Sequence, residues 1–398
     1  GLVQVTLAGI GIILGAGIYA LIGVAAGNGG NAIWLSFLLS AIVAIFTGLS
    51  YAELSSMFKS DAGEYDYVNE AINSFFARGI GISMIIAAII AAATVSLGFA
   101  GYIYTLFPLN ILVYAGLILL CMTLINYKGI KETSWFNSFA TIIELLGLLI
   151  IIVLGLFHIG EVNYFEMPQG FSGVLSSAAL VFFAFIGFES IVKLREETKN
   201  ADTVIPKAVI YSVFITSVLY VLVAFAAISI VGWETLSTSD APLATVAATA
   251  LGSSSAGLLL VFIALFSTAN TILLSLVTAS RQVYGMAEQR SLPKFFSMVS
   301  NKTQTPLAAI IFVFVVALAL AAIGDIEFVA NLSNVFIFIA FAFVNLSLII
   351  LRYKCKTRKR AFKCPANIGE FSLIAFCGLI TSLIMLGFVI QSLFSSLF

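Results

Sequence analysis

Charged residues are scarce in this sequence of 398 residues. Only 10% are Asp, Glu, Lys or Arg, whereas 61% are hydrophobic and the mean hydropathy is +1.12. A water-soluble domain carries about 25% charged residues, so the composition excludes that class. Apolar runs long enough for transmembrane helices follow one another along the chain instead. The sequence therefore predicts an integral membrane protein.

Side chains that carry enzyme chemistry are almost as scarce. A hydrolase needs a nucleophile with its base, and a metalloenzyme needs a cluster of ligands, but the chain has a single histidine. The four cysteines are not accompanied by other metal-ligating residues, so we expect them to be free thiols. There is no G-x-x-x-x-G-K-S/T phosphate loop, and no re-entrant channel filter stands out. We therefore expect a secondary transporter that is not an enzyme and has no cofactor, structural metal or nucleic-acid partner.

The hydrophobic runs predict an all-α polytopic membrane protein. No segment shows the alternation of a membrane β-strand, and the first run is too long for a cleavable signal peptide. Because the sequence starts and ends on apolar runs, we expect polar tails or a twelfth helix to extend it. Eleven spans are predicted, at residues 2–26, 31–55, 79–107, 110–127, 133–157, 171–192, 206–231, 253–286, 306–324, 328–351 and 370–396.

Charge is distributed unequally between the two sides of these spans. With a cytoplasmic N-terminus, all 19 Lys and Arg residues fall in cytoplasmic loops or at the cytoplasmic ends of spans, and the external loops carry only acids. This pattern predicts a multi-pass protein of the plasma membrane. The basic run from Arg352 to Lys363 is expected to set topology and to touch anionic lipid. Glu53 and Glu189 lie near cytoplasmic helix ends, where each is either solvated, a cap, or the partner of a loop base.

The first and sixth spans are interrupted by glycine. The stretch GIGIILGAGIYALIG, Gly9 to Gly23, holds five glycines, and LVFFAFIGFESI in the sixth span holds Gly187. Each glycine weakens a helix by about 1 kcal/mol relative to alanine. Gly11 and Gly15 form a GxxxG that also suits close helix packing. Paired interruptions in two halves are typical of the substrate site of an inverted-repeat transporter.

Two inverted five-helix repeats would place these interruptions at corresponding positions. Free N–H groups at a helix break favour a carboxylate and free carbonyls favour an ammonium group, so a zwitterion suits the pair. The resulting division of a single transmembrane domain, 1–398, is a first repeat at 1–157, a second at 171–352, and a basic loop with an accessory helix at 353–398.

Several motifs in order resemble the amino acid-polyamine-organocation superfamily of transporters, which has the leucine-transporter type of fold. The resemblance covers nearly the whole chain. Its motifs are GAGIY, YAEL, AGEYDYV, FFAFIGFES, EETKNADTVIPKAV, LFSTANTILLSLVTASRQVYGMA and NLSLIILRY. The chain departs from the family by having KNAD where many members have KNP, which affects only a cytoplasmic loop.

The resemblance implies a small-molecule amino acid substrate held by backbone at the two interruptions. The substrate carboxylate is expected at the amides of the first span and the α-amino group at carbonyls of the sixth. An aromatic residue there, Phe183, is expected either to close over the substrate as a gate or to serve in packing. The implied site comprises Ile12, Ile13, Gly15, Ala16, Gly17, Phe183, Ala184, Phe185 and Ile186.

Glu144 is the second departure, because sodium-independent relatives often carry a lysine in this span. An acid at that depth costs at least about 2.5 kcal/mol, and no Lys or Arg lies at a similar depth in the predicted spans to pair with it. Glu144 is therefore expected to carry a coupled proton, to donate a structural hydrogen bond, to bind sodium together with Ser267 and Thr268, or to contact a cationic substrate.

The remaining polar residues leave the substrate open. Asn270 and Thr271 either touch substrate or join helices by hydrogen bonds. Small apolar residues favour a neutral amino acid moved by proton symport, while exchange, or transport of basic amino acids or polyamines, is the alternative. We expect a monomer or a weak homo-oligomer.

Overall fold

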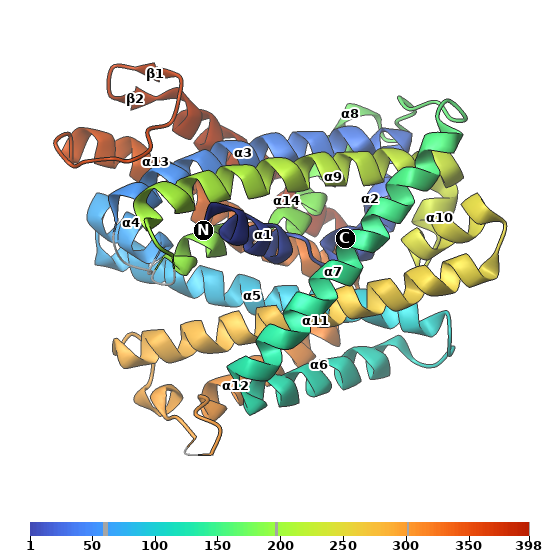
Figure 1. Cartoon of the computed structure of the whole chain (residues 1–398), viewed down its shortest axis with the longest axis horizontal. Coiled ribbons are helices and arrows are strands. Elements are labelled where there is room, and N and C mark those ends of the chain that lie inside the picture. Colours follow the sequence, from blue (N-terminus) through green and yellow to red (C-terminus); the bar gives the residue numbers. More distant parts are fainter. Residues whose placement is uncertain (59–62, 196–197, 301, 398) are drawn as a thin grey trace.

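Helices make up nearly all of the fold. The computed structural model describes residues 1–58, 63–195, 198–300 and 302–397, without the side chains at 130–136, 138 and 397. Most helices run along the longest axis of the molecule, and α7 (Ile130–Gly155) crosses them obliquely (Figure 1). Nine helical segments in the described part are long and apolar enough to cross a membrane. The prediction of an all-α polytopic membrane protein is confirmed.

Each predicted span has a counterpart among the described elements. The uninterrupted spans correspond to α3 (Ile33–Met57), α5 (Ser74–Tyr104), α6 (Ile111–Lys128), α7, α9 (Ala201–Ser237), α11 (Ser254–Glu288), α12 (Leu307–Ala321), α13 (Ile326–Lys354) and α14 (Leu373–Leu397). Short 3-10 turns η1 (Gly30–Ala32), η2 (Leu156–His158) and η5 (Lys294–Ser297) lie between them. The division into inverted repeats stays a prediction.

The first and sixth spans are discontinuous, as predicted. The first consists of α1 (Leu2–Ile13) and α2 (Ala16–Gly29), with the non-helical pair Leu14 and Gly15 between them. The sixth consists of α8 (Gly170–Val181) and the 3-10 turns η3 (Phe182–Phe185) and η4 (Phe188–Leu194). Figure 1 shows α1 in the middle of the molecule, with long helices above and below it.

Elements at the two ends of the bundle were not predicted. Helix α4 (Glu64–Ala71) and the hairpin of β1 (Asn367–Ile368) and β2 (Phe371–Ser372) lie at one end, and α10 (Pro242–Leu251) lies at the other (Figure 1).

The predicted start of the last span at residue 370 is too early, because residues 371–372 form a strand. The predicted start at 79 is too late, because the Asn73 side chain caps the helix by accepting from the amides of Phe75 and Phe76 at 3.0 and 3.1 Å.

Part of the basic run does not face lipid, which corrects the sequence prediction. Arg352 is fully buried, with Nη2 2.5 Å from Oε2 of the equally buried Glu53 and Nε 2.9 Å from Oε1. Arg360 approaches the same carboxylate at 3.4 Å, and the Cys364 amide donates to it at 2.7 Å. A buried carboxylate needs such partners, so these bases join α3, α13 and the following loop.

The thiol of Cys364 lies in this cluster. Burial and the neighbouring Glu53 carboxylate raise the pKa of the thiol well above its ordinary value. The four cysteines are free thiols, as predicted. A buried protonated thiol is a poor nucleophile, so Cys364 is a packing residue.

Removing one partner of this buried pair should destabilise the protein strongly. We expect Arg352→Met to lower the free energy of unfolding by about 3–5 kcal/mol, because the buried Glu53 carboxylate loses its closest cation and keeps only Arg360 at 3.4 Å and the Cys364 amide. Arg358→Met is the matched control, since Arg358 forms an exposed pair with Glu70 at 3.4 Å and should cost about 1 kcal/mol or less. Unfolding of the purified variants in detergent measures both, and equal losses would contradict a special role of the buried pair.

Candidate functional site

The two helix breaks touch each other at two points. A Cβ atom added to Gly17 would lie 2.5 Å from Cα of Ala184. A Cβ on Gly187 would lie 2.7 Å from the carbonyl oxygen of Ile12. Gly187 also has φ +128°, a conformation that side chains disfavour. Glycine is therefore required at both points for the backbones to approach.

The break in the first span presents unpaired helix ends. The first amides of α2, including Ala16 and Gly17, have no acceptor within their helix, and the last carbonyls of α1 have no donor within theirs. These ends carry opposite partial charges. The Ala16 amide donates to Oγ1 of Thr271 at 2.9 Å, and the hydroxyl of Tyr220 donates to the Ile13 carbonyl at 3.0 Å. Side-chain hydroxyls thus occupy one amide and one carbonyl of the break.

The break in the sixth span is held by polar side chains as well. Asn334 donates to the carbonyls of Ala179 and Leu180 at 2.8 and 3.1 Å near the end of α8. Glu189 accepts from the Gly187 amide at 2.8 Å, but the N-cap residue of η4 is Gly187, which has no side-chain cap. Phe183 is buried, with 5% of its surface exposed, so in this conformation its ring packs inside the protein.

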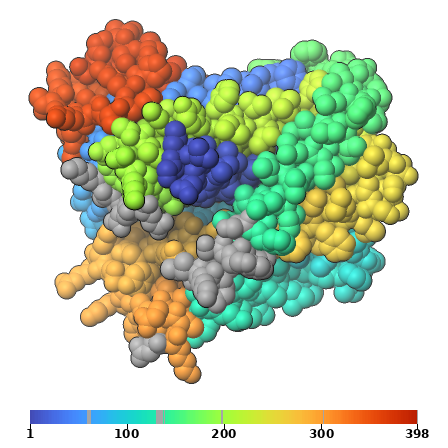
Figure 2. Space-filling model, viewed as in Figure 1, coloured from blue at the N-terminus to red at the C-terminus, as the bar shows by residue number. Residues whose placement is uncertain are grey.

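Some residues at the breaks are partly exposed. Ile12, Gly15, Ile186 and Gly187 have intermediate exposure, and α1 lies at the surface on the face that Figure 2 shows. Beyond the break, residues 16–23 of α2 are buried without exception. The exposed part of the first span is thus followed by a buried segment.

Glu144 lies close to the first break and is fully buried. Its Oε1 accepts from the hydroxyl of Ser267 at 2.6 Å. Its Oε2 has no hydrogen-bond partner, and no ion pair involving it occurs among the residues that the structure describes. The hydroxyl of Tyr19 on α2 donates to the Glu144 backbone carbonyl at 3.0 Å. A buried carboxyl group with one hydrogen bond and no cation is expected to be protonated or to take up a proton.

Two residues of α11 connect Glu144 to the break by hydrogen bonds that meet at different groups of Ser267, its carbonyl and its hydroxyl. Thr271, which accepts from the Ala16 amide, donates to the carbonyl of Ser267 at 3.1 Å. Ser267 in turn donates to Glu144. One turn of α11 thus links the N-terminus of α2 to the buried acid.

The side chains of two predicted site residues form hydrogen bonds to groups other than Glu144 and the breaks. The hydroxyl of Thr268 donates to the carbonyl of Ala264 at 2.7 Å, within its own helix, and does not bond Glu144. Asn270 donates to Asn137 on α7 at 3.0 Å, which joins two helices, and its Oδ1 is buried without a partner in the described part of the chain.

The sequence did not single out the hydroxyls that occupy the break. Thr271 was noted only as one of two ambiguous polar residues, and Tyr220 was missed. Tyr19 was missed too, although it links α2 to α7 and its own carbonyl accepts from Tyr102 at 3.1 Å. A tyrosine inside an apolar span, where its hydroxyl needs a partner, is the signal that could have found both tyrosines.

Comparisons with known proteins identify the family of the chain. The profile of a family described as amino acid permease matches residues 1–395. The chain is 31% identical to a branched-chain amino acid permease of Bacillus subtilis (strain 168) over 391 residues, which is 92% of this chain and 83% of the relative. It is 28% identical to a methylthioribose transporter of the same organism over 384 residues, 91% and 83% of the two chains.

A mammalian relative is similar over a smaller share of its own length. Cationic amino acid transporter 4 of Mus musculus is 30% identical over 394 residues, which is 92% of this chain but 61% of the relative. The resemblance to the amino acid-polyamine-organocation superfamily is confirmed, as is the expectation that the protein is a transporter and not an enzyme. The chain belongs to the amino acid permease family.

Proposed function

We propose that this amino acid transporter is a symporter that moves one neutral amino acid together with a proton by alternating access. The observation that carries the proposal is the connection from the Ala16 amide through Thr271 and Ser267 to Glu144. It joins a backbone site suited to a carboxylate with a buried group suited to a proton.

The substrate carboxylate binds at the N-terminus of α2 in this proposal. It replaces the Thr271 hydroxyl at the Ala16 amide and accepts from the Gly17 amide beside it, where the helix end is partially positive. The α-amino group binds carbonyls of the sixth span at Ala184, Phe185 and Ile186. Phe183 then turns over the substrate as a gate.

Glu144 carries the proton. A substrate carboxylate at the end of α2 adds a second negative group near Glu144, and two such groups disfavour each other's ionised forms. Substrate binding and proton binding therefore support each other, which is the condition for symport. Sodium is the weaker alternative, because the hydroxyl of Thr268, one of its three predicted side-chain ligands, is turned away.

The partly exposed break supports alternating access. Exposure at Ile12 and Gly15, followed by the buried segment 16–23, fits a site open toward the side of α1 and closed on the other. The distribution of Lys and Arg makes the α1 side cytoplasmic in this proposal. The conformation is then inward-open, and an outward-open counterpart in the plasma membrane completes the cycle.

A neutral side chain fits the surroundings of the break best. Ile12, Phe183 and Ile186 are apolar, and the branched-chain amino acid permease is a relative over most of both chains. A basic amino acid is the second candidate, because Oε2 of Glu144 lacks a partner in the described residues and a cationic amino acid transporter is also a relative. Exchange rather than symport is the alternative for either substrate.

Thermal unfolding of the purified protein against the twenty amino acids and common polyamines tests the substrate class. A ligand at one hundred times its dissociation constant stabilises the folded state by about 2.7 kcal/mol. We expect leucine, isoleucine or valine to raise the melting temperature and lysine, arginine and polyamines to leave it unchanged. The reverse order would establish the second candidate, and no shift with any compound would contradict an amino acid site at the breaks.

A further inference from the structure

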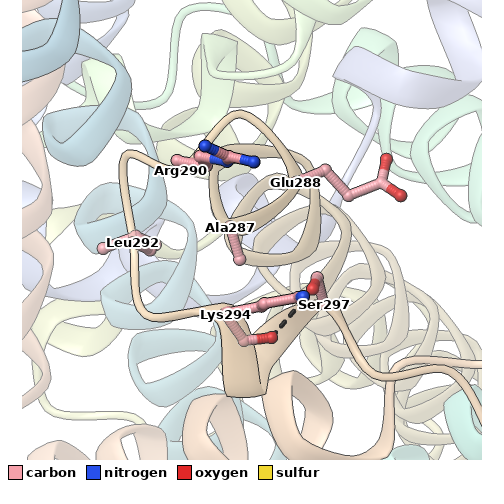
Figure 3. A pocket seen from close by; sticks show the side chains of 6 residues that line it. All are labelled: Ala287, Glu288, Arg290, Leu292, Lys294 and Ser297. Carbon is pink, nitrogen blue, oxygen red and sulfur yellow. Dashed lines mark hydrogen bonds between the residues drawn. The ribbon is translucent and has the colours of Figure 1, made fainter.

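A cavity lies far from the helix breaks, at the cytoplasmic end of α11. Its volume is about 390 Å³, and Figure 3 shows the side chains that line it. They come from the last turn of α11, the loop after it and the 3-10 turn η5. The lining residues are Ala287, Glu288, Arg290, Leu292, Lys294 and Ser297.

Positive charge in this cavity is not neutralised by protein. Arg290 and Lys294 form no ion pair with a carboxylate in the part of the chain that the structure describes. The one lining acid, Glu288, accepts at 2.6 Å from the hydroxyl of Tyr284 on its own helix, and its carboxylate lies at the far end from Lys294 (Figure 3). The hydroxyl of Ser297 adds a hydrogen-bonding group beside Lys294.

The loop that carries Arg290 is fixed against α11. The amides of Ser291 and Leu292 both donate to the carbonyl of Met286, at 2.8 and 3.2 Å, and the Arg290 amide donates to that of Ala287 at 3.1 Å. Figure 3 shows the two bases on opposite sides of the cavity, which suits a compact anion with several oxygen atoms.

Exposed apolar side chains lie next to the lining residues in the sequence. Phe295, Met298 and Val299 are 52%, 60% and 39% exposed. Phe296 packs on Phe312 of α12 with ring centroids 5.1 Å apart, so η5 rests on a membrane helix. Bases next to exposed apolar groups, at the end of a span, suit a ligand with a charged head and hydrocarbon chains.

We propose that this cavity binds the phosphate group of an anionic phospholipid of the cytoplasmic leaflet. Arg290 and Lys294 contact the phosphate oxygens, and the acyl chains lie against Phe295 and Met298. The site is separate from the substrate site and does not depend on the transport mechanism. It also differs from the basic run 352–363, part of which pairs with Glu53.

Native mass spectrometry of the full-length chain tests the site, with phosphatidylglycerol or phosphatidylcholine added as the probe. We expect Arg290→Gln/Lys294→Gln to weaken phosphatidylglycerol binding about 25-fold, since each base near the surface contributes a factor of about five. The matched control, Lys199→Gln/Lys207→Gln, removes two exposed charges near the start of α9 and should bind as the unaltered protein does. Added salt should weaken phosphatidylglycerol binding and leave phosphatidylcholine binding unchanged, which tests the site without any substitution.

Three outcomes would overturn the proposal. Equal phosphatidylglycerol binding by the unaltered and cavity variants would show that the cavity does not bind the lipid. Equal weakening in the control would show attraction by net charge alone. Displacement of the lipid by millimolar inorganic phosphate would show a site for a free anion, because the acyl chains would then contribute nothing.

Discussion

Glu144→Gln is expected to abolish accumulation driven by a pH gradient while counterflow of substrate survives. Symport of one proton per substrate lets a gradient of one pH unit support about a tenfold accumulation, since one unit corresponds to about 1.36 kcal/mol. The glutamine carbonyl can still accept from Ser267, so the local packing is kept, but the side chain can no longer take up a proton. Uptake of labelled amino acid into proteoliposomes should then end at equal concentrations inside and outside.

The matched control for this experiment is Glu161→Gln. Glu161 is an exposed acid between the fifth and sixth spans, so its loss should leave the tenfold accumulation unchanged. Accumulation by Glu144→Gln equal to that of the unaltered protein would reject Glu144 as the proton carrier. Loss of counterflow together with accumulation would assign Glu144 to substrate binding instead.

Gly17→Ala should weaken substrate binding and stability together. The new methyl group would lie 2.5 Å from Cα and 2.8 Å from Cβ of Ala184. Because the contact involves the backbone of both segments, neither can move away easily. Overpacking of this kind costs about 1–3 kcal/mol. If the breaks separate to relieve it, substrate binding must restore the contact, and the dissociation constant should rise about 5- to 150-fold. Isothermal titration with the best ligand of the thermal screen measures this change.

Gly285→Ala is the control, because it makes the same chemical change in a membrane helix. A Cβ at Gly285 has no heavy atom within 4 Å, so alanine should leave affinity unchanged and stabilise α11 by about 1 kcal/mol. Unchanged affinity in Gly17→Ala would contradict the view that close approach of the two breaks shapes the site.

The spans could be predicted from the sequence because the bilayer fixes their length and composition. The breaks could be predicted because glycine at Gly15, Gly17 and Gly187 is costly in a helix unless the backbone needs it. Helix α10 and the β-hairpin could not, because they are too short to span a bilayer, so apolar run length carries no signal for them. The start of α5 at the N-cap residue Asn73 could have been predicted, since asparagine favours that position.

The partners within the site depend on how helices are rotated against each other. A hydroxyl such as that of Thr271 can bond its own helix or a neighbour, and the sequence does not say which. Glu144 was recognisable as a lone deep acid, but its contact with Ser267 spans 123 residues. The sequence likewise left undecided whether Glu53 pairs with Arg352, which lies 299 residues away. The structure shows the pair because it shows both side chains buried together.

A structure of the protein with a bound neutral amino acid tests the central claim most directly. The account predicts the substrate carboxylate on the amides of Ala16 and Gly17, with Thr271 displaced, and the ammonium group on the carbonyls of Ala184 to Ile186. An amino acid bound elsewhere, with the Thr271 hydroxyl still on the Ala16 amide and both breaks unoccupied, would contradict it.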